Sequence, residues 1–148
     1  MDTLIKPDDV LSLAYTADSG VTNIKILKMD IAAVEGKFLL PIIGERLYNS
    51  LAEGNYPALL RDYVAPMVAA WTRYISEPMM VERCAYESSA AYNEVRRVIL
   101  RRLRGIARNF SRQLSNYLNA HCEEFPEYNP ADNTLNHCSI DGDIVQVF

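Results

Sequence analysis

Five arginines recur at helical spacing and are the residues best suited to binding another molecule. They stand 4, 3, 4 and 4 positions apart, at Arg97, Arg101, Arg104, Arg108 and Arg112. On an α-helix, which turns by about 100° per residue, these side chains fall within a sector of about 80°. We call this set the Arg stripe. It predicts a basic helix face that attracts carboxylates or phosphates.

The Arg stripe needs an acidic neighbour because like charges four positions apart repel. Each such pair costs about 0.2–0.5 kcal/mol, so the whole stripe carries about 1–2 kcal/mol of repulsion. Three partners are compatible with it: the acidic tail of this chain, an acidic surface on another subunit, or nucleic-acid phosphate. A solvated surface helix is the alternative that needs no partner. A membrane-surface helix is disfavoured, since the apolar side of the same helix is needed for the core.

The formal net charge of −4 conceals an uneven distribution of charge. The segment 96–112 holds seven arginines and no acid, so the rest of the chain has 8 basic and 19 acidic residues and a net charge of −11. The segment 113–148 holds six acids and no lysine or arginine. An acidic chain without a recognisable nucleic-acid module favours protein partners over nucleic acid for the Arg stripe.

Two His-Cys pairs contain the ligand atoms that zinc prefers, but their spacing is wrong. His121-Cys122 and His137-Cys138 are adjacent pairs, and adjacent side chains point in different directions, whereas zinc pairs leave two to five residues between ligands. The chain also lacks the G-x-S-x-G, Gly-rich phosphate-loop and H-E-x-x-H motifs. We therefore predict no catalytic residue, no metal, no cofactor and no small-molecule substrate, and conclude that the protein is not an enzyme.

The length and composition predict one helical domain. The chain has 148 residues, of which 49% are hydrophobic and 23% are charged, as in ordinary globular proteins. We predict an all-α fold, a small bundle of about four to five helices with a long C-terminal helix and an irregular tail. Residues 1–125 form the domain, residues 1–20 form an N-terminal arm with a short helix, and residues 126–148 form a flexible tail because turn formers cluster there.

Apolar residues three or four positions apart mark the helices of the first half. One stripe runs from Ile24 through Leu27 to Phe38 and is expected to end at Pro41. A short helix follows Gly44, and a third, expected to kink at Pro66, runs to Pro78. Within the third helix Trp71 stands with Tyr63, Met67 and Tyr74 at a spacing typical of a core, although such a cluster could also stack a ligand.

The long C-terminal helix is expected from about residue 80 to about residue 121. Its apolar series is Val95, Ile99, Ile106, Phe110, Leu114 and Tyr117. Some 40 residues would extend about 60 Å, which exceeds the diameter of about 40 Å of a compact domain of this length. We therefore expect a break near Ser88-Ser89 or Gly105, or a protruding helix that another subunit covers.

Several strings in the first half resemble an uncharacterised prophage family related to bacteriophage head-to-tail connector (adaptor) proteins. They are Asp9-Val10-Leu11-Ser12-Leu13, the segment 31–44 (IAAVEGKFLLPIIG), Leu47-Tyr48 with Leu51, and Tyr63-Val64-Ala65-Pro66. The likeness covers about residues 8–78 in motif and extends to about residue 120 in helix pattern. It departs after Pro78, where Met79-Met80-Val81-Glu82 replaces the polar loop expected there.

This resemblance implies a helical subunit of a ring between the portal and the tail of a phage particle, without catalysis. It implies a homo-oligomer with portal or tail proteins as partners, located in the cytoplasm of the host bacterium and in the virion. The Arg stripe would then serve an interface. The alternative is a nucleic-acid-binding accessory factor that uses Arg97 to Arg112 and works close to DNA. The chain has no apolar run of the roughly 20 residues that span a bilayer, so no membrane association is expected.

Overall fold

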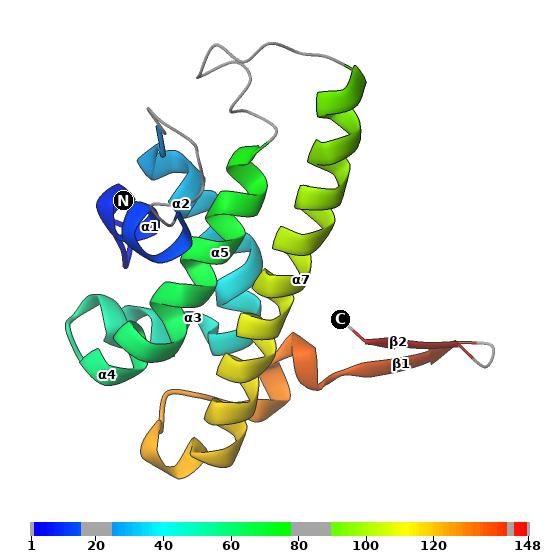
Figure 1. Cartoon of the computed structure of the whole chain (residues 1–148). Coiled ribbons are helices and arrows are strands. Elements are labelled where there is room, and N and C mark those ends of the chain that lie inside the picture. Colours follow the sequence, from blue (N-terminus) through cyan, green and yellow to red (C-terminus); the bar gives the residue numbers. More distant parts are fainter. Residues whose placement is uncertain (1, 16–24, 78–89, 142–143, 148) are drawn as a thin grey trace.

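The protein is mainly α-helical, which confirms the predicted all-α class. The computed structural model describes residues 2–15, 25–77, 90–141 and 144–147 (Figure 1). Its helices are α1 (Pro7–Ala14), α2 (Lys28–Val34), α3 (Leu40–Ala52), α4 (Pro57–Leu59), α5 (Ala65–Ser76) and α7 (Ala90–Ala120). Helix α5 lies at the centre, between α1 and α2 on one side and α7 on the other. No helix within the described residues is long and apolar enough to cross a bilayer.

Helices α1 and α2 begin in the same way, with an acidic side chain that accepts a hydrogen bond from the backbone just ahead of the helix. Asp9 accepts from Lys6 N at 2.8 Å, and Asp30 accepts from Leu27 N at 3.3 Å. This is half of a capping box. The sequence pattern placed Leu27 in the core, but its side chain is 41% exposed, and Ile26 is buried instead. The predicted first residue of that apolar stripe, Ile24, lies outside the described residues.

Two prolines that were expected to end or bend helices follow π-helical turns. The turn Glu35–Leu39 (η2) joins α2 to α3 ahead of Pro41, and the turn Leu60–Val64 (η3) joins α4 to α5 ahead of Pro66. A proline has no N–H and its ring crowds the carbonyl four residues earlier, so a wider turn ahead of it gives the ring room. The prediction that the helix ends at Pro41 is therefore wrong.

The helical path breaks at Gly44 instead. Its φ of 78° and ψ of 164° lie in a region that is essentially restricted to glycine. A Cβ atom built on Gly44 meets no other atom within 4 Å, and the same holds for Gly105 in α7. The two glycines therefore differ in backbone conformation but not in available space.

This difference predicts opposite effects for one substitution. Gly44→Ala is expected to lower the free energy of unfolding by about 1–3 kcal/mol, because alanine must adopt a strained conformation there. Gly105→Ala is expected to raise it by about 0.5–1 kcal/mol, because alanine favours the helix. Urea unfolding followed by far-UV circular dichroism measures both. Equal effects of the two variants would contradict the break at Gly44.

Helix α7 is continuous over 31 residues, which corresponds to about 46 Å. The predicted break at Gly105 is absent from it, and the other predicted break, Ser88-Ser89, lies outside the described residues. Among the α7 side chains that the structure describes, those of residues 96–120, the buried ones are Leu103, Ala107, Ser111, Leu114, Ser115 and Leu118. Three of these are small, which lets α7 lie close against α5.

The buried face of α7 is rotated from the predicted one by about 100°, or one residue position. Of the residues predicted to face the core, Leu114 is buried and Phe110 and Tyr117 pack against the core, whereas Ile99 and Ile106 are 36% and 39% exposed. We call Ile99 and Ile106 the apolar strip. It flanks the buried face on one side, while the Arg stripe flanks it on the other.

The segment after α7 is irregular, as expected, but its first part packs against the domain. It forms three 3-10 turns, Cys122–Glu124 (η5), Pro130–Asp132 (η6) and Thr134–Asn136 (η7). Phe125, Tyr128 and Asn133 in this segment are 4%, 5% and 0% exposed. The chain therefore stays packed against the domain beyond residue 126, where the flexible tail was predicted to start.

A short antiparallel hairpin follows at the C-terminal end. Strand β1 (Cys138–Asp141) pairs with β2 (Ile144–Val147), so that Cys138 lies opposite Val147. The hairpin projects outward from the helices (Figure 1), and each strand has its main contacts with the other strand. The end of the chain was expected to belong to a flexible tail, but residues 144–147 pair within the chain.

Candidate functional site: a basic cleft beside α7

A cleft of about 650 Å³ runs along α7 on the side of the Arg stripe. Its walls come from η2 and the start of α3, from the second half of α5, from the middle of α7 and from η7. The lining residues are Lys37, Phe38, Pro41, Ile42, Trp71, Tyr74, Arg104, Arg108, Ser111, Arg112, Ser115, Asn116, Thr134, Leu135 and Asn136. We call it the basic cleft. Its volume lies within the range typical of ligand sites in proteins.

The charge of the basic cleft is entirely positive among the residues that line it. Lys37, Arg104, Arg108 and Arg112 contribute four cations, and the lining contains no aspartate or glutamate. The ion pairs Lys28–Asp2 and Arg61–Asp62 lie elsewhere, and no described carboxylate pairs with Arg104, Arg108 or Arg112. Four cations around one cleft create a positive potential that concentrates anions.

The three wall arginines are spaced so that they face the cleft from successive turns of α7. Arg104, Arg108 and Arg112 are four positions apart, and together they cover about 12 Å of the helix axis. All three are exposed. The arrangement suits an extended anionic ligand that lies parallel to α7.

Aromatic rings form an apolar part of the same cleft. The rings of Phe38 and Trp71 are stacked, with centroids 3.9 Å apart and planes 7° apart. Tyr74 meets Trp71 edge to face at 5.7 Å. Trp71 also donates a hydrogen bond from Nε1 to Ser111 Oγ at 2.8 Å, which ties α5 to α7. Trp71 is thus a core residue, as its spacing indicated, and it also lines the cleft.

The rim opposite the aromatic rings is neutral and held by amide hydrogen bonds. Asn136 Nδ2 donates to Pro130 O at 2.9 Å and to Asn119 Oδ1 at 3.0 Å. Asn119 in turn donates to Asn136 Oδ1 at 2.7 Å. These bonds connect η7 to the last turns of α7, so the rim does not depend on the hairpin that follows it.

Two acids of the C-terminal segment, Glu127 and Asp132, are engaged away from the basic cleft. Glu127 accepts hydrogen bonds from Tyr56 Oη at 2.9 Å and from Ser50 Oγ at 3.4 Å. A hydrogen bond from its own backbone N–H and the one from Tyr56 lower the pKa of Glu127. Asp132 accepts from Asn129 at 3.1 Å. The first candidate partner of the Arg stripe, the acidic tail of the same chain, therefore makes no contact with it through these residues.

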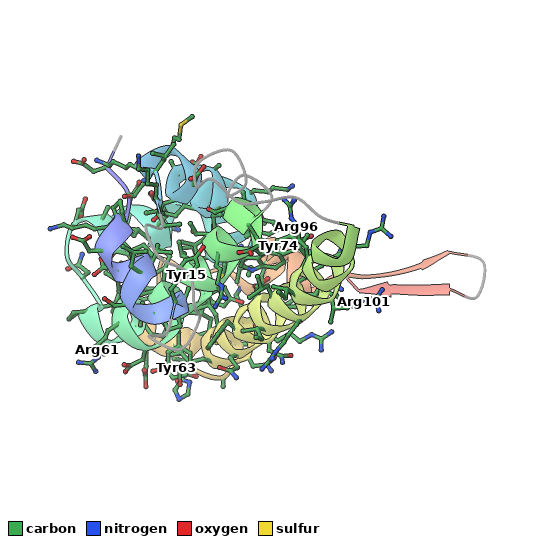
Figure 2. All side chains as sticks on the ribbon, turned by 45° about the horizontal axis from the view of Figure 1, so that its top comes forward. Tyr15, Arg61, Tyr63, Tyr74, Arg96 and Arg101 are labelled. Carbon is green, nitrogen blue, oxygen red and sulfur yellow. The ribbon has the colours of Figure 1, made fainter. Side chains whose placement is uncertain are left out.

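The structure brings only part of the Arg stripe to the cleft. Arg104, Arg108 and Arg112 line it, whereas Arg97 and Arg101 lie nearer the start of α7 and are exposed. In Figure 2, Arg101 stands on α7 on the side from which the hairpin projects, and Arg61 lies on the opposite side of the molecule. Sequence analysis missed Lys37 as a fourth cation, because nothing in a linear pattern links residue 37 to residues 104–112.

The two His-Cys pairs lie apart from the cleft and each histidine contacts a backbone carbonyl. His121 Nδ1 lies 3.0 Å from Tyr117 O, and His137 Nε2 lies 2.8 Å from Ala131 O. No group of three or more histidine, cysteine, aspartate or glutamate side chains within the described residues is arranged to hold a metal ion. The chemistry that the cleft offers is recognition of an anion by guanidinium groups beside aromatic rings.

The chain is similar to a family of unknown function (DUF6712) over residues 81–137. The matched stretch covers less than half of the chain and contains the whole Arg stripe and the η6 and η7 turns. No curated protein matches the chain, and no solved structure matches it either.

Proposed function

We propose that this protein is a structural subunit of a phage-like head-to-tail connector, a ring that joins the portal to the tail in the virion. In this role it binds other copies of itself and neighbouring virion proteins and catalyses no reaction. The observation that carries the proposal is the basic cleft, which has four cations and no acid in a chain whose other residues are strongly acidic.

The distribution of charge supports a head-to-tail contact between copies. Exposed acids lie on α1, at Asp8 and Asp9, whereas the arginines lie on α7, on the other side of α5 (Figure 1). A subunit with unlike faces associates through heterologous interfaces, which close into a ring when the rotation between subunits allows it. Opposite charges across such an interface favour encounter and fix orientation.

The apolar strip is a second exposed surface that supports the same proposal. Ile99 and Ile106 expose apolar side chains on the flank of α7 that faces away from the Arg stripe. The core of a protein interface is enriched in apolar side chains and surrounded by polar ones. Helix α7 therefore presents a charged and an apolar surface to neighbours.

Light scattering at about 50 mM and about 500 mM salt tests the proposal, because the higher concentration screens exposed charges. The full chain, alone or with a purified portal ring, is expected to associate at low salt and less at high salt. Arg104→Glu with Arg108→Glu should abolish association. Arg46→Glu with Arg61→Glu is the matched control, since it changes the net charge equally at two exposed arginines that do not line the cleft. A wild-type chain that stays monomeric and ignores the portal at both salt concentrations would overturn the proposal.

A nucleic-acid-binding accessory factor is the second candidate, favoured by the aromatic rings beside the cations. Single-stranded nucleic acids bind to basic grooves in which bases stack on aromatic side chains. This alternative predicts binding of an oligonucleotide that weakens steeply with salt and is lost on the same double reversal of Arg104 and Arg108. A gel shift in dilute buffer without any retarded band would exclude it.

A further inference from the structure

The structure contains an outward-projecting hairpin beside a cleft of complementary chemistry. Strands β1 and β2 leave the domain directly after η7, which forms the rim of the basic cleft. The sequence of residues 138–148 is CSIDGDIVQVF, with two aspartates, five branched or aromatic apolar residues and no basic residue. The hairpin is thus acidic and apolar, while the cleft is basic and aromatic.

We propose that the C-terminal hairpin of one copy occupies the basic cleft of a neighbouring copy, an inference that rests on the proposed ring assembly and specifies its contact. Asp141 and Asp143 would lie against Arg104 and Arg108, and the apolar residues of the strands would lie against the rings of Phe38 and Trp71. The same contact repeated around the ring links each subunit to the next.

The length of a hairpin strand agrees with the length of the row of arginines in the basic cleft. A four-residue strand such as Ile144–Val147 extends about 13 Å, and Arg104 to Arg112 cover about 12 Å of α7. A strand of this length therefore matches the row of arginines along the cleft.

The direction of the hairpin favours a neighbouring copy over the same chain. The hairpin projects away from the helices (Figure 1), and its strands have their main contacts with each other. To enter its own cleft it would have to reverse direction within the few residues after η7, where Asn136 is held by hydrogen bonds to Asn119 and Pro130. In a neighbour the same outward course carries the hairpin to the next subunit without that reversal.

A charge exchange between two full-length variants tests this proposal. One variant carries Arg104→Glu and Arg108→Glu, and the other carries Asp141→Lys and Asp143→Lys. In each variant alone the charges at positions 141 and 143 have the same sign as those at positions 104 and 108, so each variant is expected to remain monomeric by light scattering. In an equimolar mixture both contacts regain opposite charges, and association at low salt is expected to return. Far-UV circular dichroism checks that both variants keep the helical content of the wild type.

The fluorescence of Trp71 gives an independent readout, because it is the single tryptophan of the chain and it lines the cleft. A synthetic peptide of residues 138–148 contains no tryptophan or tyrosine. Added to the Asp141→Lys, Asp143→Lys chain, it is expected to change the emission of Trp71 in a saturable way. A peptide with both aspartates replaced by asparagine should bind about tenfold more weakly. Arg102→Glu in the acceptor chain should leave the affinity unchanged.

The outcomes separate this inference from the proposed function. If the wild type assembles and the Asp141→Lys, Asp143→Lys variant assembles equally well, the hairpin contact is wrong while the ring assembly stands. A mixture that remains monomeric also overturns the contact between copies. If a single-stranded oligonucleotide saturates the Trp71 signal and the peptide does not, the cleft binds nucleic acid and the hairpin proposal is wrong.

Discussion

Asn133→Ala is expected to lower the free energy of unfolding by about 2–4 kcal/mol, because it removes three hydrogen bonds from a fully buried site. The Asn133 side chain is 0% exposed. Its Nδ2 donates to Tyr128 Oη at 2.8 Å and to Ser115 Oγ at 2.9 Å, and its Oδ1 accepts from Leu135 N at 2.9 Å. The substitution leaves these partners buried without Asn133. Urea unfolding followed by Trp71 fluorescence measures the loss.

The matched control is Asn109→Ala, which changes an exposed asparagine on α7 and should alter stability by less than about 0.5 kcal/mol. This pair of variants decides between two descriptions of the C-terminal segment. If residues after 125 were a flexible tail, as the sequence indicates, Asn133→Ala would be as neutral as the control. A neutral result would contradict the packing of this segment against α7.

Glu35→Gln is expected to change the pH dependence of stability, because Glu35 is a carboxylate buried in η2. The residue is 2% exposed, and its oxygens accept hydrogen bonds from Leu4 N at 2.8 Å and Tyr48 Oη at 2.7 Å. Burial raises the pKa of Glu35 above its ordinary value of 4.5, against the opposing effect of these hydrogen bonds. The native state therefore holds the Glu35 proton more tightly than the unfolded chain does.

The sign of the effect follows from proton linkage. Between pH 4.5 and the higher native pKa of Glu35, the native state binds more protons than the unfolded state, so stability falls as pH rises. Glu35→Gln removes this contribution. The stability of the variant relative to the wild type is expected to increase from pH 4.5 upward and then to level off. A relative stability that decreases over that range would contradict the raised pKa.

Glu35→Ala provides the matched comparison at the same position. It removes both acceptors and leaves Leu4 N and Tyr48 Oη without this partner, so a loss of about 2–3 kcal/mol is expected. Because Leu4 belongs to the N-terminal arm, amide exchange of that arm should also become faster. Urea unfolding from pH 4 to pH 8 on the two variants and the wild type separates the hydrogen-bonding effect from the effect of charge.

Local patterns in the sequence predicted the helices well. Apolar spacing predicted the third helix with Met67 and Trp71 in the core, and both are buried. Proline is favoured at the first position of a helix, and Pro57 is the first residue of α4. These features depend on backbone preferences and on periodicity over a few turns, which neighbouring residues determine.

The face that α7 buries was harder to predict, because its core contacts are made by small and polar side chains. Ala107, Ser111 and Ser115 recur every four residues on the buried face, but two of them are serines that a hydrophobicity pattern assigns to the surface. They are buried because Ser111 accepts a hydrogen bond from Trp71 and Ser115 accepts one from Asn133. A search for small residues at four-residue spacing would have indicated this face.

The sequence by itself determined the helical class, the arginines that share one side of α7, and the uneven charge of the chain. These properties follow from residue types and from spacing within a single element. The tertiary structure decided which arginines face a cleft, added Lys37 and the Phe38–Trp71 stack to them, and packed the segment up to Asn136 against α7. Such features join residues that are dozens of positions apart, and they depend on how the helices pack, which no local pattern specifies.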